Sequence, residues 1–151
     1  MKKNQQGFTL IELLVVIAII GLLSTLSIVA LNQARARSRD ARRIADVKQI
    51  QTALEMYYND LGKYPPDADI VAGSSMSSST IVYMSIIPKP PVPADNALCS
   101  NTIKYTYTVG NIGGVTNGTY SLIYCLGSNT GGIPSGLNTA SPSGIGLRSL
   151  P

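Results

Sequence analysis

The sequence predicts an α+β protein in which one long N-terminal helix, half membrane-spanning and half amphipathic, packs against a small antiparallel β-sheet. A nearly uninterrupted apolar run from Leu13 to Leu31 passes into a segment of helical periodicity that ends near Leu61. Two β-branched and aromatic runs, 103–109 and 119–126, then flank a turn-forming segment. With 151 residues, the chain suits one compact domain plus an extra element.

A short basic leader, residues 1–7, precedes the apolar run. Its small residue Gly7 stands before the apolar region, whereas the cleavage site of a common secretory signal follows that region. Cleavage after Gly7 would therefore leave the hydrophobic helix on the mature chain. From Leu13 to Leu31 this helix would rise about 28 Å, close to the hydrocarbon thickness of a bilayer, so it can span a membrane.

Glu12 is the exception within the apolar stretch. An unpaired carboxylate inside a bilayer costs on the order of 3 kcal/mol, so it needs a partner there. Cleavage after Gly7 would create one, because the new α-amino group of Phe8 lies one helical turn away and at similar depth in neighbouring copies. Such pairs would set the register of a staggered helix bundle. The alternative is that Glu12 sits at the membrane interface without a role.

The segment Gly7-Phe8-Thr9-Leu10-Ile11-Glu12, between a Lys-bearing leader and an apolar helix, resembles the prepilin cleavage and methylation signature of type IV pilins and type II secretion pseudopilins. The resemblance implies a pilin-like fold, a membrane peptidase that cuts after Gly7 and methylates Phe8, and an assembly role for Phe8, Thr9 and Glu12. Many members of that family carry a proline late in the apolar helix, whereas no proline occurs here before Pro65.

A basic segment follows the apolar run, with arginines at positions 35, 37, 39, 42 and 43. We expect these side chains to lie against lipid phosphates in an isolated subunit, or to face the acids of neighbours or the solvent in a filament. A nucleic-acid site is the alternative, but the aromatic residues that usually interleave such patches are missing.

Beyond the arginines, apolar residues recur at spacings of three and four, which predicts an amphipathic helix. The apolar stripe comprises Ile44, Val47, Ile50, Leu54, Tyr57 and Leu61. The opposite face comprises Lys48, Gln49, Thr52, Glu55 and Asn59. Gly62 is predicted to cap the helix, and Pro65 and Pro66 prevent its continuation, so the whole helix would run from Phe8 to about Leu61.

The segment from Asp67 to Ala97 is rich in Ser, Pro and Gly and predicts a long surface connection, interrupted by a short element at 81–87. The two strand-like runs after it predict a hairpin with its turn between Gly110 and Gly118. Within that turn, Asn117-Gly118-Thr119 also fits an N-glycosylation acceptor, but Asn-Gly is first a turn signal. The region after Gly127 is predicted as either an ordered cover or a loose tail.

Cys99 and Cys125 are the only cysteines, and in an exported chain an even pair indicates a disulfide. Cys99 precedes the first strand of the hairpin and Cys125 ends the second, so antiparallel pairing would bring them to the same end of the sheet. The predicted organisation is therefore a leader (1–7), a transmembrane and polymerisation helix (8–31), an amphipathic helix (32–61), a variable connection (62–98) and a β-sheet head with a C-terminal disulfide region (99–151).

The sequence predicts a structural protein rather than an enzyme, with no catalytic residue, cofactor or metal site. The chain has no His, its cysteines are predicted to be structural, and Glu12 belongs to the membrane segment. Asp67 and Asp69 lie close together, but paired acids in a Pro-flanked loop are usually solvated.

The resemblance implies a subunit of a type IV pilus-like filament that serves adhesion, twitching motility or DNA uptake. Its implied partners are copies of itself, the prepilin peptidase and methyltransferase, the inner-membrane assembly machinery and, for the monomer, the membrane. The chain would be a single-pass membrane protein before assembly and part of a cell-surface filament afterwards.

Two alternatives remain. The first is a type II secretion pseudopilin; major pseudopilins bind calcium through acids in C-terminal loops, and here the segment from Asn96 to Pro151 has no Asp or Glu. The second is a secreted or membrane-anchored soluble domain. The secreted form would leave Glu12 unexplained, and in the anchored form five arginines beyond the helix, against two lysines in the leader, oppose the usual positive-inside orientation.

Overall fold

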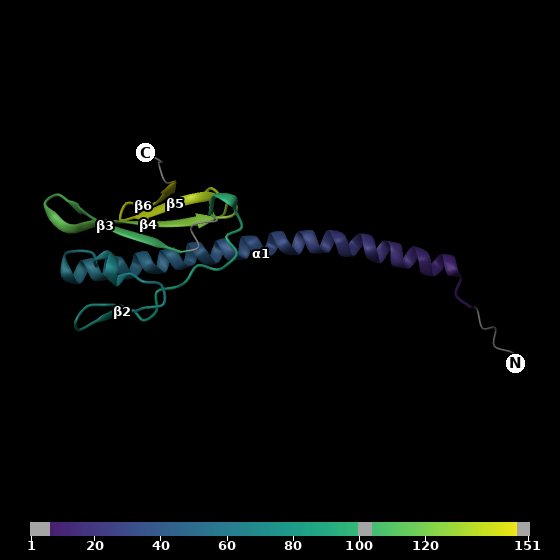
Figure 1. The fold of residues 1–151 in the computed structure, drawn as a ribbon, viewed down its shortest axis with the longest axis horizontal. Helices are drawn as coiled ribbons and strands as arrows, with labels where there is room; N and C mark the ends of the chain where they lie inside the picture. Colours follow the sequence, from purple (N-terminus) through teal and green to yellow (C-terminus); the bar gives the residue numbers. More distant parts are fainter. Residues whose placement is uncertain (1–6, 100–103, 148–151) are drawn as a thin grey trace. The chain divides into compact units, whose positions relative to one another are not determined.

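Helix α1 spans Leu10–Leu61 in a computed structural model that describes residues 7–99 and 104–147 (Figure 1). It begins two residues later than predicted and ends where predicted. Gly62 follows with a φ of +67°, and its N–H donates to the Tyr58 carbonyl at 2.7 Å, which is a glycine C-terminal cap. The chain divides into two compact units, residues 1–35 (unit 1) and residues 36–151 (unit 2).

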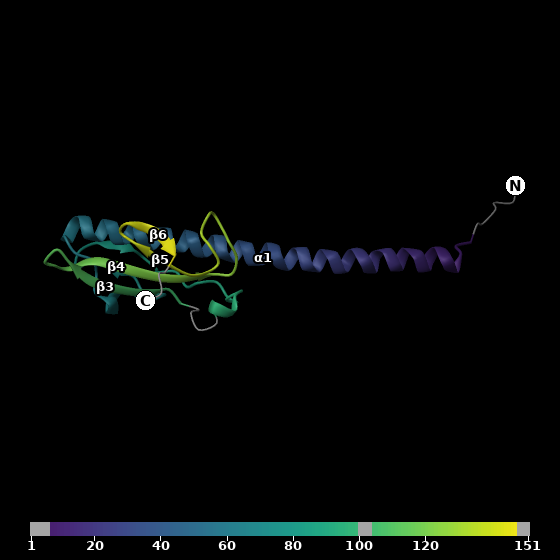
Figure 2. The ribbon, with the colours of Figure 1, turned by 90° about the horizontal axis from the view of Figure 1, so that it is seen from above.

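Unit 2 contains a four-stranded antiparallel sheet in the order β3-β4-β5-β6, which Figure 2 shows side by side. The strands are β3 (Thr106–Ile112), β4 (Val115–Leu126), β5 (Gly136–Ser141) and β6 (Gly144–Leu147). The predicted hairpin is confirmed as β3 and β4. The region after Gly127 is an ordered part of the sheet, because β5 pairs with β4 and β6 pairs with β5.

The turn of the hairpin lies at Gly113 and Gly114, inside the predicted segment between Gly110 and Gly118, but the interpretation of Asn117-Gly118 as a turn is wrong. Both Gly113 and Gly114 have positive φ, and the flanking residues Ile112 and Val115 pair directly. Asn117 lies inside β4, with a φ of 58°. Its side-chain N–H₂ donates to the Tyr64 carbonyl at 3.3 Å, so this side chain is engaged within the fold.

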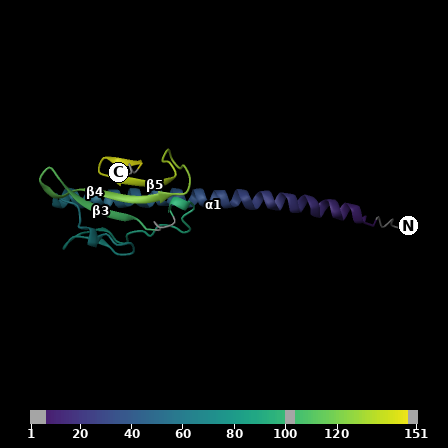
Figure 3. The same cartoon turned by 45° about the horizontal axis from the view of Figure 1, so that its top comes forward.

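The connection between α1 and β3 carries four short elements. They are the 3₁₀ turns η1 (Asp67–Asp69) and η2 (Ala97–Cys99) and the strands β1 (Met76–Ser77) and β2 (Val82–Met84), which pair with each other. The short element predicted at 81–87 is therefore β2. Figure 1 shows the large sheet on one side of the second half of α1 and β2 on the other, and Figure 3 shows the sheet lying over that half of the helix.

The core of unit 2 lies where the second half of α1 meets the sheet. Its buried residues include Val47, Ile50, Leu54 and Tyr57 from α1 and Tyr107, Tyr120, Leu122, Tyr124 and Leu126 from β3 and β4. The predicted apolar stripe is thus confirmed except at its last position, because Leu61 is 43% exposed. The five residues predicted on the opposite face of the helix are all exposed.

The outer edge of β3 is partly covered by η1. The Val109 N–H donates to the Asp67 carboxylate at 2.6 Å, and the Tyr107 hydroxyl donates to the Pro65 carbonyl at 2.9 Å. At the other end of the sheet, Cys99 and Cys125 form the predicted disulfide, with their Cα atoms 5.6 Å apart and both residues buried. This bond joins the segment before β3 to the last residues of β4.

Candidate assembly site

Unit 1 exposes an apolar helix surface that no other part of that unit covers. Phe8 and Leu10 are 82% and 80% exposed, and each large apolar residue from Phe8 to Leu31 is at least 45% exposed. The most apolar window of α1 has a mean hydropathy of 2.8 and none of it is buried. A surface of this size needs a bilayer or other protein chains around it. Among the described residues, α1 is the one helix long and apolar enough to cross a membrane.

Thr9 and Glu12 form a reciprocal cap at the start of α1. The Thr9 N–H and hydroxyl donate to Glu12 Oε2 at 2.8 and 2.6 Å, and the Glu12 N–H donates to the Thr9 hydroxyl at 3.3 Å. This is the capping box expected of a Thr-x-x-Glu segment, a signal that the sequence carries but that the predictions above did not use. The box leaves Glu12 Oε1 without a hydrogen bond from a described residue.

Three hydroxyl side chains in the middle of the apolar helix donate to the carbonyl groups of their own helix. Ser24, Thr25 and Ser27 bond to Ile20, Leu22 and Leu23 at 2.7 to 2.8 Å. Because these hydroxyls are satisfied locally, they add little to the cost of placing the helix in lipid.

The arginines after the apolar run do not form a single solvent-facing group, and the prediction is wrong for two of them. Arg39 binds the Asp95 carboxylate with two nitrogens, and its Nε lies 2.7 Å from Asp95 Oδ2. Arg43 is only 3% exposed and donates to Asp40 Oδ1 at 2.6 Å. It also donates to the carbonyl groups of Pro91 and Pro93. Both arginines therefore hold unit 2 together.

Asp40 is the fully buried centre of this network. Besides the bond from Arg43, its oxygens accept from the backbone N–H groups of Gly127 and Ser128 at 2.9 and 2.8 Å and from the Ser128 hydroxyl at 2.9 Å. A buried carboxylate is tolerated when hydrogen bonds and an ion pair satisfy it in this way. We refer to Arg39, Asp40, Arg43 and Asp95 as the buried charge cluster.

The cluster changes the acid–base behaviour of two of its groups. The hydrogen bond from Arg39, followed by the positive charges of Arg39 and Arg43, lowers the pKa of Asp95 below its usual range. The same bond raises the pKa of Arg39. Nearby, burial and then the hydrogen bond to Asp46 raise the pKa of Tyr105, whose hydroxyl donates to Asp46 at 2.8 Å.

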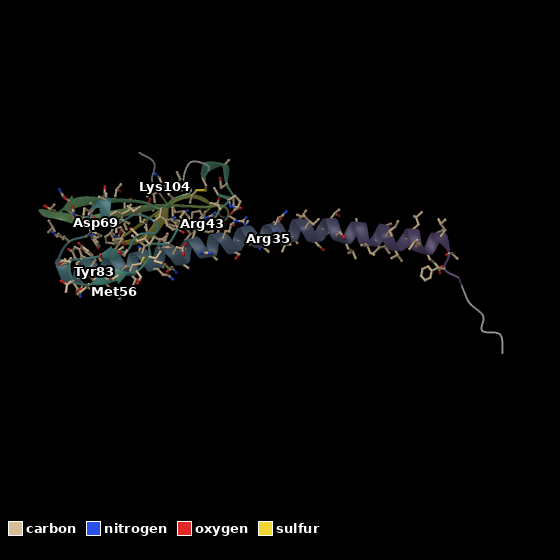
Figure 4. The ribbon with its side chains drawn as sticks, turned by 60° about the horizontal axis from the view of Figure 1, so that its bottom comes forward. Arg35, Arg43, Met56, Asp69, Tyr83 and Lys104 are labelled. Atoms are coloured by element: carbon tan, nitrogen blue, oxygen red, sulfur yellow. A yellow bond between two sulfur atoms is a disulfide. The ribbon has the colours of Figure 1, made fainter. Side chains whose placement is uncertain are left out.

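Arg35, Arg37 and Arg42 are exposed and make no ion pair with any residue that the structure describes. Figure 4 shows Arg43 and Asp69 toward opposite ends of unit 2.

The described residues contain no group of three or more His, Cys, Asp or Glu side chains placed to hold a metal ion. A shallow groove of about 320 Å³ runs between α1 and β2, lined by Gln49, Thr52, Ala53, Met56, Tyr83 and Met84.

Comparisons with known proteins point to one family and differ in how much of the chain they cover. Residues 2–28 match the family model of the prokaryotic N-terminal methylation motif. The type IV major fimbrial protein FimA of Dichelobacter nodosus is 35% identical over 107 residues, which cover 64% of this chain and 69% of that protein. The fimbrial protein EcpC of Eikenella corrodens is 31% identical, with coverage of 77% and 74%.

The type II secretion system core protein G of Aeromonas hydrophila is 36% identical over 64 residues, which cover 42% of this chain and 45% of that protein. The match to this secretion protein therefore spans less than half of either chain, whereas the matches to FimA and EcpC given above cover more of both chains. No solved structure matches this chain.

Proposed function

We propose that this chain, which belongs to the family of type IV pilins and type II secretion pseudopilins, is the structural subunit of a pilus-like filament that polymerises through its N-terminal helix. The observation that carries the proposal is the apolar surface of unit 1, from Phe8 to Leu31, with a single carboxylate at its start. Lipid covers this surface in the monomer. The helices of other copies cover it in the filament.

The processing step of the proposal concerns Gly7 and Phe8. Cleavage after Gly7 by a prepilin peptidase, followed by methylation of the new amino group, would place a cation at Phe8, directly before the Thr9 that bonds Glu12. The amine of a neighbouring Phe8 would then reach Glu12 Oε1, the oxygen that the capping box leaves free. Thr9 would keep Glu12 oriented toward that neighbour.

A pilus is favoured over a secretion pseudopilus by two observations. Two fimbrial relatives, FimA and EcpC, match about two thirds or more of their own length, whereas the secretion relative matches less than half of its length. The resemblance to major pseudopilins also implies acidic calcium ligands in the C-terminal loops, and the segment from Asn96 to Pro151 contains no Asp or Glu.

The assembly role of Glu12 is tested with Glu12→Ala in the producing cell. We expect the variant to be exported and cleaved normally but to give far fewer filaments, because its subunits lack the carboxylate that fixes axial register. Ser24→Ala is the matched control, since it removes a side chain that bonds only within its own helix. Normal filament yield from Glu12→Ala would refute the assembly role.

The class of filament is tested on sheared cell-surface material. Mass spectrometry should find a mature chain that starts at methylated Phe8, and negative-stain microscopy should find long surface fibres built from it. Short fibres confined to the periplasm would indicate the pseudopilus instead. A chain trimmed after the apolar helix, or one that stays monomeric with its leader, would contradict both.

A further inference from the structure

Among the described residues of unit 2, two arginines have no internal ion pair. Arg37 and Arg42 lie on α1 beside Arg39 and Arg43, yet they are exposed and bind none of the acids that the structure describes. An arginine guanidinium that has no partner within its own fold can bind a carboxylate on another molecule with two N–H groups.

The acids that remain available lie at the other end of the same unit. Asp60, in the last turn of α1, is exposed and accepts one hydrogen bond, from the Tyr83 hydroxyl at 3.0 Å. Asp69, in η1, is exposed, and its carboxylate bonds to none of the described residues. Asp60 follows Arg42 by 18 residues, which is about five helical turns and about 27 Å, so these two side chains cannot pair within one chain.

The set of carboxylates that could bind these arginines is small, because the sequence contains only eight acidic residues. Six are committed elsewhere: Glu12 lies in the apolar helix, Asp40, Asp46 and Asp95 bind within unit 2, Glu55 accepts from the hydroxyls of Tyr64 and Tyr120, and Asp67 accepts from Val109. Glu55 and Asp67 are also exposed, but both oxygens of Glu55 accept from the Tyr64 hydroxyl, and Asp67 is bound by the backbone of β3. Asp60 and Asp69 are therefore the acids that we assign to the contact with a second copy.

We propose that Arg37 and Arg42 of one subunit form ion pairs with Asp60 and Asp69 of a second copy that is displaced along the filament axis. The proposal rests on the proposed function, since it needs subunits that share one direction. The two surfaces are different and lie at opposite ends of unit 2, so the contact is heterologous and repeats without closing. Opposite charges would also steer an incoming subunit into this stagger.

Charge reversal in the full-length protein tests the pairing. Arg37→Glu with Arg42→Glu should lower the amount of sheared filament by about tenfold or more, and Asp60→Arg with Asp69→Arg should do the same, because each set places like charges together. All four changes in one chain should restore the wild-type amount. Lys48→Glu is the matched control, since it reverses an exposed cation further along the same helix and should leave the amount unchanged.

A crosslink tests proximity independently. Filaments of the double variant Arg42→Cys and Asp60→Cys should give a ladder of covalent multimers with a short bismaleimide, because the native cysteines are already paired. The Lys48→Cys and Asp60→Cys filaments should give none.

Three results would overturn the pairing. The first is a variant with all four changes that yields no more filament than the two double variants, and the second is a normal filament yield from Arg37→Glu with Arg42→Glu. The third is the absence of covalent multimers from the Arg42→Cys and Asp60→Cys filaments. If only the arginine reversals mattered, the arginines would serve another surface, such as anionic phospholipid, and the pairing would also be wrong. In each case wild-type fibres that start at Phe8 would still support the proposed function, which fails only if those fibres do not form.

Discussion

Arg43 Nη1 lies 2.6 Å from Asp40 Oδ1, less than one helical turn away along α1, and both side chains are buried. Around this pair, Asp40 holds the backbone of Gly127 and Ser128, while Arg43 holds the carbonyl groups of Pro91 and Pro93. Two segments far apart in the sequence are thereby bound to one turn of the helix.

Removing one member of this pair should destabilise unit 2 strongly. We expect Asp40→Ala to lower the free energy of unfolding by about 3–5 kcal/mol, because it leaves the Arg43 charge buried and two backbone N–H groups unbonded. Urea unfolding of the full chain in detergent micelles, followed by tyrosine fluorescence, measures this. Arg37→Ala, an exposed position on the same helix, should change stability by no more than about 0.5 kcal/mol. Equal effects of the two variants would contradict the role of the pair.

Gly127 should not tolerate a side chain. A Cβ atom built there would lie 2.5 Å from Asp95 Cβ and 3.3 Å from the Asp95 carbonyl carbon, so the backbone of the Asp95 segment would have to move. We expect Gly127→Ala to cost about 1–3 kcal/mol by overpacking. Gly146→Ala is the matched control, because no atom lies within 4 Å of its Cβ position. Comparison of the two unfolding midpoints decides the point, and a Gly127→Ala midpoint at or above that of Gly146→Ala would refute it.

The Asp95 ion pairs should make unit 2 sensitive to acid. Arg39 lowers the pKa of Asp95 in the folded state, so the unfolded chain takes up this proton more readily than the folded chain does. The stabilisation is present above the unfolded pKa of about 3.9 and is lost as the pH falls through the lower folded pKa. The melting temperature should therefore drop on acidification below about pH 4.

The Asp95→Asn variant should start from a lower melting temperature at neutral pH and show a shallower decline in acid. Asp69→Asn, which removes an exposed carboxylate without an internal ion pair, should keep the wild-type decline. If Asp95→Asn followed the wild-type curve in acid, Asp95 would not be the group responsible.

The disulfide should contribute most of its effect through the unfolded chain. It closes a loop with a sequence separation of 26, for which the chain-entropy estimate is about 3.5 kcal/mol. The double variant Cys99→Ala and Cys125→Ala should lose about that much stability relative to the oxidised protein. Wild-type protein under reducing conditions should unfold at the same urea concentration as the variant, and a large gap between them would mean that packing of the sulfurs matters more than the crosslink.

The elements predicted well are those that depend on local signals. The stripe that includes Val47, Ile50 and Leu54 follows helical spacing, and Gly62 supplies the positive φ that a helix cap needs. The hairpin was likewise visible in two runs of β-branched and aromatic residues. Its turn lies within the predicted segment, but Asn117-Gly118 was wrongly interpreted as a turn because it and Gly113-Gly114 are both turn signals. The pair of glycines forms the two-residue connection, and Asn117 adopts its positive φ inside the strand instead.

What the sequence did not reveal depends on long-range contacts. Asp95 lies 56 residues from Arg39 in a Pro-rich segment, and the spacing of the arginines carries no sign of that partner. The strands β5 and β6 were missed because Gly, Ser and Asn dilute their β-branched residues. They are stabilised by pairing with β4 rather than by their own propensity. The ion pair between Asp40 and Arg43 could have been predicted, since an acid three residues before a base on a helix indicates a side-chain pair.

The bond from Val109 to Asp67 has a consequence beyond the single domain. A filament holds a great many identical sheets at very high local concentration, where an open strand margin invites amyloid-like stacking with the next molecule. Asp67 occupies one of the outward amides on the β3 side and adds a negative charge there. Pairing of β3 with a strand of another molecule is thereby disfavoured, so the growth of the fibre depends on contacts between helices.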